Sequence, residues 1–206
     1  MSTIERLFVS QLYRASFPGK AGQRLNAGLE RACRAIAAED RAGQAWCREH
    51  GYAGYTSYAS LEDLVWRSPE IGELKDRLDE HVGIFARELE LDLGRQKLML
   101  DSIWINILAP GGTHGAHIHP HSVISGTHYV TVPPDASVIK FEDPRLGLMM
   151  AAPPRKPSAK RENRNFVAVD PKPGTLLLWE SWLRHEVPVN RSRSDRISIS
   201  FNYGWR

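Results

Sequence analysis

Apolar side chains recur every three or four positions through much of the first half of the chain. This spacing runs through residues 22–40 and returns from Ile71 to Leu89. It is the period of an amphipathic helix that buries one face. Pro69 stands where the second helix would begin, and proline suits the first turn of a helix. The pattern therefore predicts two long helices within residues 1–97.

Shorter elements are expected before and between these helices. Apolar residues near Leu7–Tyr13 predict an opening strand. Ser60 is expected to open a short turn of helix, because Asp63 follows three positions later, as in a capping box. Residues 51–55 contain two glycines and two tyrosines and predict a loop. Apart from the opening strand, residues 1–97 form a mainly helical region in this interpretation.

From Leu98 onward, apolar and polar positions alternate with period two. Side chains alternate in this way across a strand, and these runs are rich in β-branched and aromatic residues. Proline and glycine turns separate the runs, with no helical period between them. The expected strands are 100–108, 123–132, 137–142, 166–170, 175–180, 183–189 and 196–203. Such a series favours an antiparallel sandwich or barrel, with a ligand cavity between the sheets or at the barrel mouth.

Length and composition place both parts in one domain. The chain has 206 residues, and 42% of them are hydrophobic, which is enough for a single core. We expect one mainly β domain with N-terminal helices (α+β) over 1–206, with a helical support region at 1–97 and a sheet core at 98–206. The net charge of +3 is too small to indicate a nucleic-acid partner.

The same composition bears on location. No apolar run reaches the roughly 18–20 residues of a membrane span, and the N-terminus lacks the apolar stretch of a secretory signal. Only Cys33 and Cys47 are present, which are too few for a disulfide framework. A reducing, cytoplasmic location with no membrane contact is therefore expected.

Histidines gather in one short segment. Five of the eight lie between His114 and His128. His117 and His119 stand two positions apart, so on a strand both imidazoles would face the same side. This favours a metal site, because neutral imidazole is a common metal ligand, although a structural or surface role is the alternative. His114 is expected in a turn, and His128 is expected to face away from Tyr129.

Two further groups lie near the C-terminus. His185 follows a buried strand and needs a polar partner, which a metal or a backbone carbonyl would supply. Arg196 and Ser198 stand on the polar face of the last strand. If that face looks into the barrel, the guanidinium requires an anion, and a carboxylate would bind it in bidentate fashion. If it looks outward, Arg196 is only an edge charge.

One long connection, residues 147–165, has no periodicity. It is rich in proline and basic residues. It is either a solvated surface loop or a mobile flap over a site, since long loops in compact domains are often functional. The basic residues between Arg155 and Arg164 hint at a polar or anionic substrate.

Taken together, several stretches resemble the Fe(II)- and 2-oxoglutarate-dependent oxygenase superfamily, more narrowly its bacterial and phage branch. The matching stretches are WIN (104–106), HIHPHSVISGTHYVTVP (117–133), FEDPR (141–145), PGTLLLWESWLRHEV (173–187) and RISISFN (196–202). The resemblance implies a double-stranded β-helix, that is, a cupin-like jelly roll, as the core. It covers about half of the chain, residues 98–203, in the order typical of the superfamily.

The resemblance also implies a set of site residues. His117, His119 and His185 would bind Fe(II), and Arg196 and Ser198 would hold the distal carboxylate of 2-oxoglutarate. Tyr129 and Asn106 are candidates for lining the co-substrate pocket. Beyond them, Trp104 and Trp179 either line the same pocket or fill the core. The chain departs from the usual ligand set of two histidines and one carboxylate, because His119 stands where the carboxylate is usual.

The implied activity is that of a dioxygenase. With dioxygen, it would oxidise a C–H bond and convert 2-oxoglutarate to succinate and carbon dioxide. One alternative is a cupin-like three-histidine metalloenzyme that does not use 2-oxoglutarate; another is a non-enzymatic jelly-roll protein that binds a ligand. The substrate is expected to be a small molecule with polar or anionic character, and sheet edges would allow a homodimer.

Overall fold

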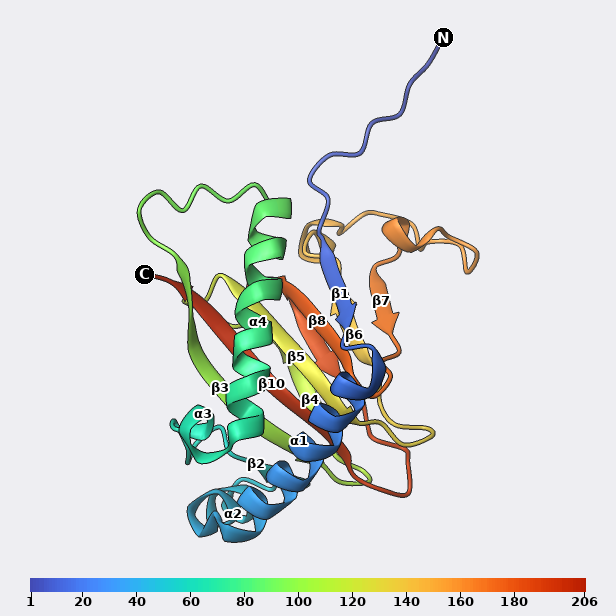
Figure 1. Cartoon of the computed structure of the whole chain (residues 1–206). Helices are drawn as coiled ribbons and strands as arrows, with labels where there is room; N and C mark the ends of the chain where they lie inside the picture. Colours follow the sequence, from blue (N-terminus) through green and yellow to red (C-terminus); the bar gives the residue numbers. More distant parts are fainter.

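Two antiparallel sheets form the centre of the molecule (Figure 1). The computed structural model describes residues 1–206. The larger sheet has six strands in the order β1-β8-β5-β10-β3-β2, and the smaller has four in the order β4-β9-β6-β7. The strands are β1 (Leu12–Ser16), β2 (Gly54–Thr56), β3 (Leu98–Leu108), β4 (His114–His117), β5 (Ile124–Thr131), β6 (Ile139–Glu142), β7 (Phe166–Val169), β8 (Thr175–Glu180), β9 (His185–Val187) and β10 (Arg196–Trp205). The mainly β architecture predicted from the alternation is confirmed.

Helices cover the outer face of the larger sheet (Figure 1). The two long ones are α1 (Gly19–Glu39) and α4 (Pro69–Glu88), close to the predicted bounds. Pro69 is the first residue of α4, and the Ser68 hydroxyl caps that helix by accepting a hydrogen bond from Ile71 N–H. The shorter helices are α2 (Arg41–Glu49) and α3 (Leu64–Arg67). Every helix is too short or too polar to cross a bilayer.

Period-two alternation sends the two faces of the larger sheet to different surroundings. On β10, Ile197 and Ile199 belong to the core beneath the helices, whereas Arg196 and Ser198 line the cavity between the sheets. The same rule applies on β5, where Tyr129 faces the inner cluster that joins the sheets. A polar face can therefore be buried without disturbing the main core.

Four predicted details of the N-terminal half and the histidine segment are wrong. The opening strand is β1, later than the expected start at Leu7, because pairing with β8 begins only at Leu12 and Phe8 has a positive φ of 56°. Part of the expected loop at 51–55 is the start of β2, which pairs with the end of β3. Tertiary pairing overrides the local glycine and tyrosine signals there.

The other two differences concern a helix start and a histidine. The Ser60 hydroxyl donates to Asp40 instead of opening a helix, and α3 begins only after Asp63, whose side chain makes no capping bond. His114 lies in β4, opposite Val187 of β9, and not in a turn. His128 does face away from the cavity: its ring is fully buried and stacks on Phe17.

Candidate metal centre

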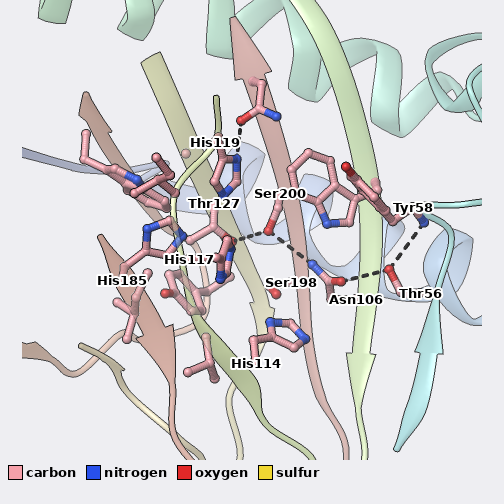
Figure 2. Close-up of a pocket in the computed structure, with 18 of the residues that line it drawn as sticks. Thr56, Tyr58, Asn106, His114, His117, His119, Thr127, His185, Ser198 and Ser200 are labelled. Atoms are coloured by element: carbon pink, nitrogen blue, oxygen red, sulfur yellow. Dashed lines mark hydrogen bonds between the residues drawn. The ribbon is translucent and has the colours of Figure 1, made fainter. Parts of the chain in front are cut away.

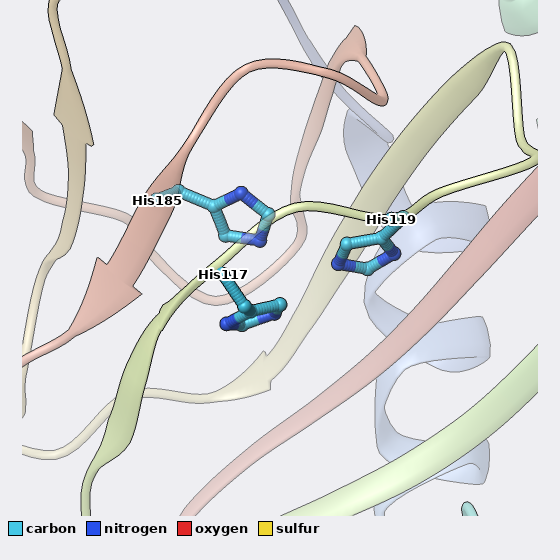
Figure 3. Close-up of side chains that lie close together, drawn as sticks. All are labelled: His117, His119 and His185. Carbon is cyan, nitrogen blue, oxygen red and sulfur yellow. The ribbon is translucent and has the colours of Figure 1, made fainter. Parts of the chain in front are cut away.

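Three histidines from two neighbouring segments converge at the edge of the smaller sheet (Figure 3). His117 at the end of β4 is the direct cross-strand partner of His185 at the start of β9. His119 lies two residues beyond β4, where its backbone N–H donates to the Ser181 carbonyl. One ring nitrogen from each residue lies within 4.8 Å of the other two. The expected trio is therefore brought together, with His119 just outside the strand.

Each of these imidazoles has one nitrogen already engaged. The Nδ1 atoms of His117 and His185 lie 2.6 and 2.9 Å from the backbone carbonyls of Gly115 and Leu183. The Nδ1 atom of His119 lies 2.6 Å from the side-chain oxygen of Asn202. Because these acceptors require a proton on Nδ1, all three Nε2 lone pairs are left free. This is the arrangement in which histidines bind metals through Nε2.

Burial keeps the inner histidines neutral. Burial lowers the pKa of His185 to about 3, and it lowers the pKa of His119 although the hydrogen bond that this ring makes to the Asn202 oxygen opposes the shift. The Nε2 atom of His119 is buried and has no hydrogen-bond partner. A buried polar atom without a partner is costly, and a metal ion would satisfy it. The donor set and this orphaned nitrogen fit a metal such as iron or zinc.

Arg196 lies in the same cavity and lacks an anionic partner. It is 2% exposed, yet no carboxylate lies within ion-pair distance of its guanidinium. It donates a 3.4 Å hydrogen bond to the Ser198 hydroxyl and stacks over the Tyr129 ring at 4.8 Å, while its Nε makes no bond. A buried charge without a counter-ion is expensive, so this position suits an anionic ligand.

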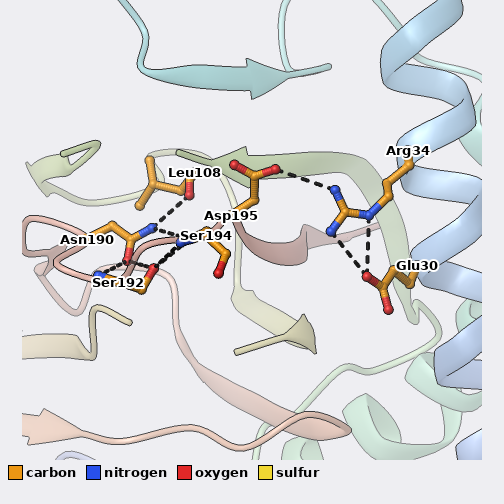
Figure 4. Close-up of polar contacts among 7 residues, drawn as sticks. All are labelled: Glu30, Arg34, Leu108, Asn190, Ser192, Ser194 and Asp195. Carbon is orange, nitrogen blue, oxygen red and sulfur yellow. Dashed lines mark hydrogen bonds and ion pairs between the residues drawn. The ribbon is translucent and has the colours of Figure 1, made fainter. Parts of the chain in front are cut away.

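The loop before β10 fixes where that strand begins (Figure 4). Asn190 donates from its amide to the Leu108 carbonyl at 2.9 Å and accepts from the Ser192 hydroxyl at 2.8 Å. At the other end of the loop, Asp195 pairs with Arg34 of α1 at 3.4 Å. These contacts tie the loop to β3 and to α1 directly before Arg196, the first residue of β10.

The remaining predicted residues line the cavity, whose volume is about 390 Å³ (Figure 2). The Tyr129 hydroxyl is buried without a partner, and burial raises its pKa while the nearby Arg196 charge opposes the shift. Asn106 is different because its amide is engaged at both ends: its oxygen accepts from Thr56 at 3.0 Å and its nitrogen donates to Ser200 at 3.2 Å. Trp104 and Trp179 also line this cavity.

Two contributors were not predicted. Tyr52 from the helical half lines the cavity, and its hydroxyl lies 2.7 Å from Nε2 of His114, whose pKa burial lowers to about 4. No pattern in residues 51–55 indicates this contact, because the two residues come together only in the folded chain. Asn202 has the same parity on β10 as Arg196 and Ser198, and this alternation is the signal that could have linked it to the site.

Other nearby polar groups stay out of the centre. Glu142 pairs with Arg184, and Asp143 pairs with Arg145, so neither carboxylate approaches the histidines as a ligand. None of residues 147–165 lines the histidine cavity. That loop instead borders a separate groove together with the N-terminal segment. The cavity therefore gives no support to the interpretation of residues 147–165 as a flap over the site.

Two packed antiparallel sheets enclose three free imidazole nitrogens and a buried guanidinium in one cavity. This is the arrangement of a cupin-like jelly-roll protein with a candidate metal centre. Residues 102–202 match the family model described as "Putative 2OG-Fe(II) oxygenase". This stretch is 101 of the 206 residues, and it makes the sheet region of the chain similar to the family of 2OG-Fe(II) oxygenases. No curated protein matches the sequence.

Solved structures share the fold. A prolyl-4-hydroxylase from Pseudomonas putida aligns with a TM-score of 0.60 and 14% identity, covering 96% of this chain and 94% of that one. The epimerase SnoN, in complex with Fe3+, alpha ketoglutarate and nogalamycin RO, aligns with a TM-score of 0.60 and 15% identity over 95% and 79% of the two chains. An oxidoreductase of the 2OG-Fe(II) oxygenase family from Burkholderia pseudomallei has 17% identity and a TM-score of 0.42; the match covers 54% of this chain and only 47% of that one. At these identities the first two likenesses establish the fold, a double-stranded β-helix with supporting helices.

Proposed function

We propose that this chain is an Fe(II)- and 2-oxoglutarate-dependent dioxygenase that oxidises a C–H bond of a small molecule. In this reaction 2-oxoglutarate would be converted to succinate and carbon dioxide. One observation carries the proposal: three free Nε2 atoms and a buried guanidinium without a counter-ion line the same cavity. The metal and the dicarboxylate each account for one of these unsatisfied features.

His117, His119 and His185 would hold the iron. Three neutral imidazoles suit this metal and leave further coordination positions for a co-substrate and dioxygen. Their Nδ1 bonds orient the rings before the metal arrives, so little ordering remains at the moment of binding. When bound, Fe(II) and 2-oxoglutarate would supply the oxidising chemistry with dioxygen, while the protein orients the substrate and excludes water.

Arg196 would bind the distal carboxylate of 2-oxoglutarate. A guanidinium binds a carboxylate through two parallel hydrogen bonds, and its Nε is free to take part. Ser198 is 2% exposed and adjacent on the same face, where its hydroxyl can donate to the same carboxylate. The unpartnered Tyr129 hydroxyl suits this role better than Asn106, whose amide already has protein partners.

The charge of the cavity bears on the substrate. Its wall contains no aspartate or glutamate, and Arg196 is its only arginine or lysine. With three neutral ligands, Fe(II) and Arg196 together exceed the two negative charges of 2-oxoglutarate by one. This excess supports a substrate with polar or anionic character. The basic loop that first suggested such a substrate does not line this cavity.

The test separates the proposal from its two alternatives. Anaerobic titration of 2-oxoglutarate into the Fe(II)-loaded protein should give saturable binding, and admission of oxygen should yield succinate. A three-histidine enzyme of the cupin type would bind iron but form no succinate. A non-enzymatic binding protein would tolerate His117→Ala without any change in ligand affinity. Absence of 2-oxoglutarate binding to the iron-loaded protein would contradict the proposal.

A further inference from the structure

His119 is the least constrained of the three candidate ligands by the sheet itself. His117 and His185 sit opposite each other in paired strands, whereas His119 follows β4 and is followed by Pro120. Its ring is therefore not directed by strand geometry alone. The contact that directs it is the 2.6 Å hydrogen bond between its Nδ1 and the Asn202 side-chain oxygen.

Asn202 is itself held on both sides. It is 8% exposed on β10, and its cross-strand neighbours are Ser125 of β5 and Ser102 of β3. The Ser125 hydroxyl donates to its side-chain oxygen at 2.7 Å, and its amide nitrogen donates to the Ser102 hydroxyl at 3.0 Å. This network turns the amide oxygen toward His119, which places the imidazole proton on Nδ1 and leaves Nε2 free.

We propose that Asn202 is a positioning residue for the metal centre: it orients His119 in the Nε2-binding form and, being neutral, leaves the centre its extra positive charge. The inference rests on the proposed three-histidine centre. His119 stands where the metal-bound carboxylate is usual. Asn202 does not bind the metal in this arrangement; its amide oxygen orients the His119 imidazole, which does. A carboxylate at 202 would accept the same proton and would also make the imidazole a stronger donor to the metal.

The chain contains a matched pair elsewhere. On the helix side of the larger sheet, and outside the cavity of the candidate ligands, Asn26 and His128 pair through their side chains at 3.2 Å. Substitutions of Asn26 therefore report the general effect of altering a partly buried asparagine–histidine contact. They should leave the metal centre untouched.

The test measures binding of Co(II) by its visible absorption, with no turnover involved. Asn202→Leu removes the acceptor, and we expect its Co(II) affinity to fall about 10- to 100-fold, as for other groups that orient metal-binding histidines. Asn202→Asp keeps the acceptor, so its affinity should equal or exceed that of the wild type, and the Fe(III)/Fe(II) potential should become more negative. Asn26→Leu should bind Co(II) like the wild type. A merely structural role would weaken Asn202→Asp as much as Asn202→Leu.

Nitrogen NMR of the metal-free wild type keeps the test independent of variant folding. The His119 ring should carry its proton on Nδ1. A proton on Nε2, or a wild-type Co(II) affinity in Asn202→Leu, would overturn the role of Asn202 while leaving the centre in place. Failure of the wild type to bind Co(II) would instead overturn the three-histidine centre, and the role of Asn202 with it.

Discussion

Arg196→Met is expected to change stability and ligand binding in opposite directions. The methionine has a similar length, but it carries no charge and no hydrogen-bond donor. In the metal-free protein, Arg196 is 2% exposed with no carboxylate partner. Replacing buried ionic groups by apolar groups of similar volume is often neutral or stabilises a protein by about 1–4 kcal/mol, and here there is no partner charge to lose. Loss of the stacking on Tyr129 offsets about 0.5–2 kcal/mol of this, so the midpoints of the two ranges leave a net gain of about 1 kcal/mol.

The effect on 2-oxoglutarate has the other sign. Removing one partner of a buried, hydrogen-bonded charge pair costs about 2–5 kcal/mol of binding free energy. That loss corresponds to a decrease in affinity of about 30- to 5000-fold, because each 1.4 kcal/mol is a factor of ten. Metal binding should survive, since Arg196 makes no hydrogen bond to a candidate ligand.

Two measurements on the same variant test whether Arg196 binds 2-oxoglutarate or has a structural role only. Urea unfolding of the metal-free protein gives the change in stability, and calorimetric titration of 2-oxoglutarate into the zinc-loaded protein gives the change in affinity. Arg193→Met is the matched control, because Arg193 is exposed and does not line the cavity. An Arg196→Met protein that is less stable than the wild type, yet binds 2-oxoglutarate equally well, would show that the guanidinium has a structural role only.

Three further outcomes are expected. His185→Ala should lose Co(II) binding in an absorption titration, whereas His121→Ala, which changes a histidine outside the cavity, should retain it; equal affinities would exclude His185 as a ligand. Burial lowers the pKa of His128 from 6.5 to about 3, so the unfolded chain takes up the proton first as pH falls below 6.5, and this group alone should cost about 2 kcal/mol of stability at pH 5. Between pH 7 and pH 5, urea unfolding should therefore show a smaller loss of stability for His128→Gln than for the wild type. An equal loss of stability in both proteins would refute the lowered pKa of His128. A Cβ on Gly126 would lie 2.5 Å from a core side chain, so Gly126→Ala should cost about 1–3 kcal/mol in thermal or urea unfolding, while Gly147→Ala, which meets open space, should be neutral.

The sheet and the site were predictable from the sequence to different degrees. Strands such as β10 follow directly from alternation, because a period-two pattern assigns each side chain to one face of the sheet. The displaced β1 shows the limit: the apolar residues from Leu7 to Val9 remain exposed, and only pairing with β8 decides where the strand begins. The local pattern indicates which residues can form a strand, whereas pairing with the neighbouring strand determines where that strand begins and ends.

The candidate ligands could be predicted for a similar reason, but their environment could not. His117 and His119 stand two positions apart in the sequence, which predicted rings on the same side, although His119 lies just beyond β4 and Asn202 directs its ring. The contact between His119 and Asn202 spans 83 residues, and the one between Tyr52 and His114 spans 62. Such pairs depend on the register of several strands at once. The sequence therefore indicated which atoms could bind a metal, while only the fold shows what keeps their Nε2 atoms free.

One strand joins the two halves of this site. Along the polar face of β10, Arg196 lies at one end of the cavity and Asn202 contacts His119 at the other. The opposite face of the same strand, which includes Ile199, is packed in the core beneath α1 and α4. The face that the helices cover and the face that carries Arg196 and Asn202 belong to one strand, which is hydrogen-bonded to β3 on one side and to β5 on the other. The N-terminal helices thus bear on both the anion position and the orientation of His119, although they supply no candidate metal ligand.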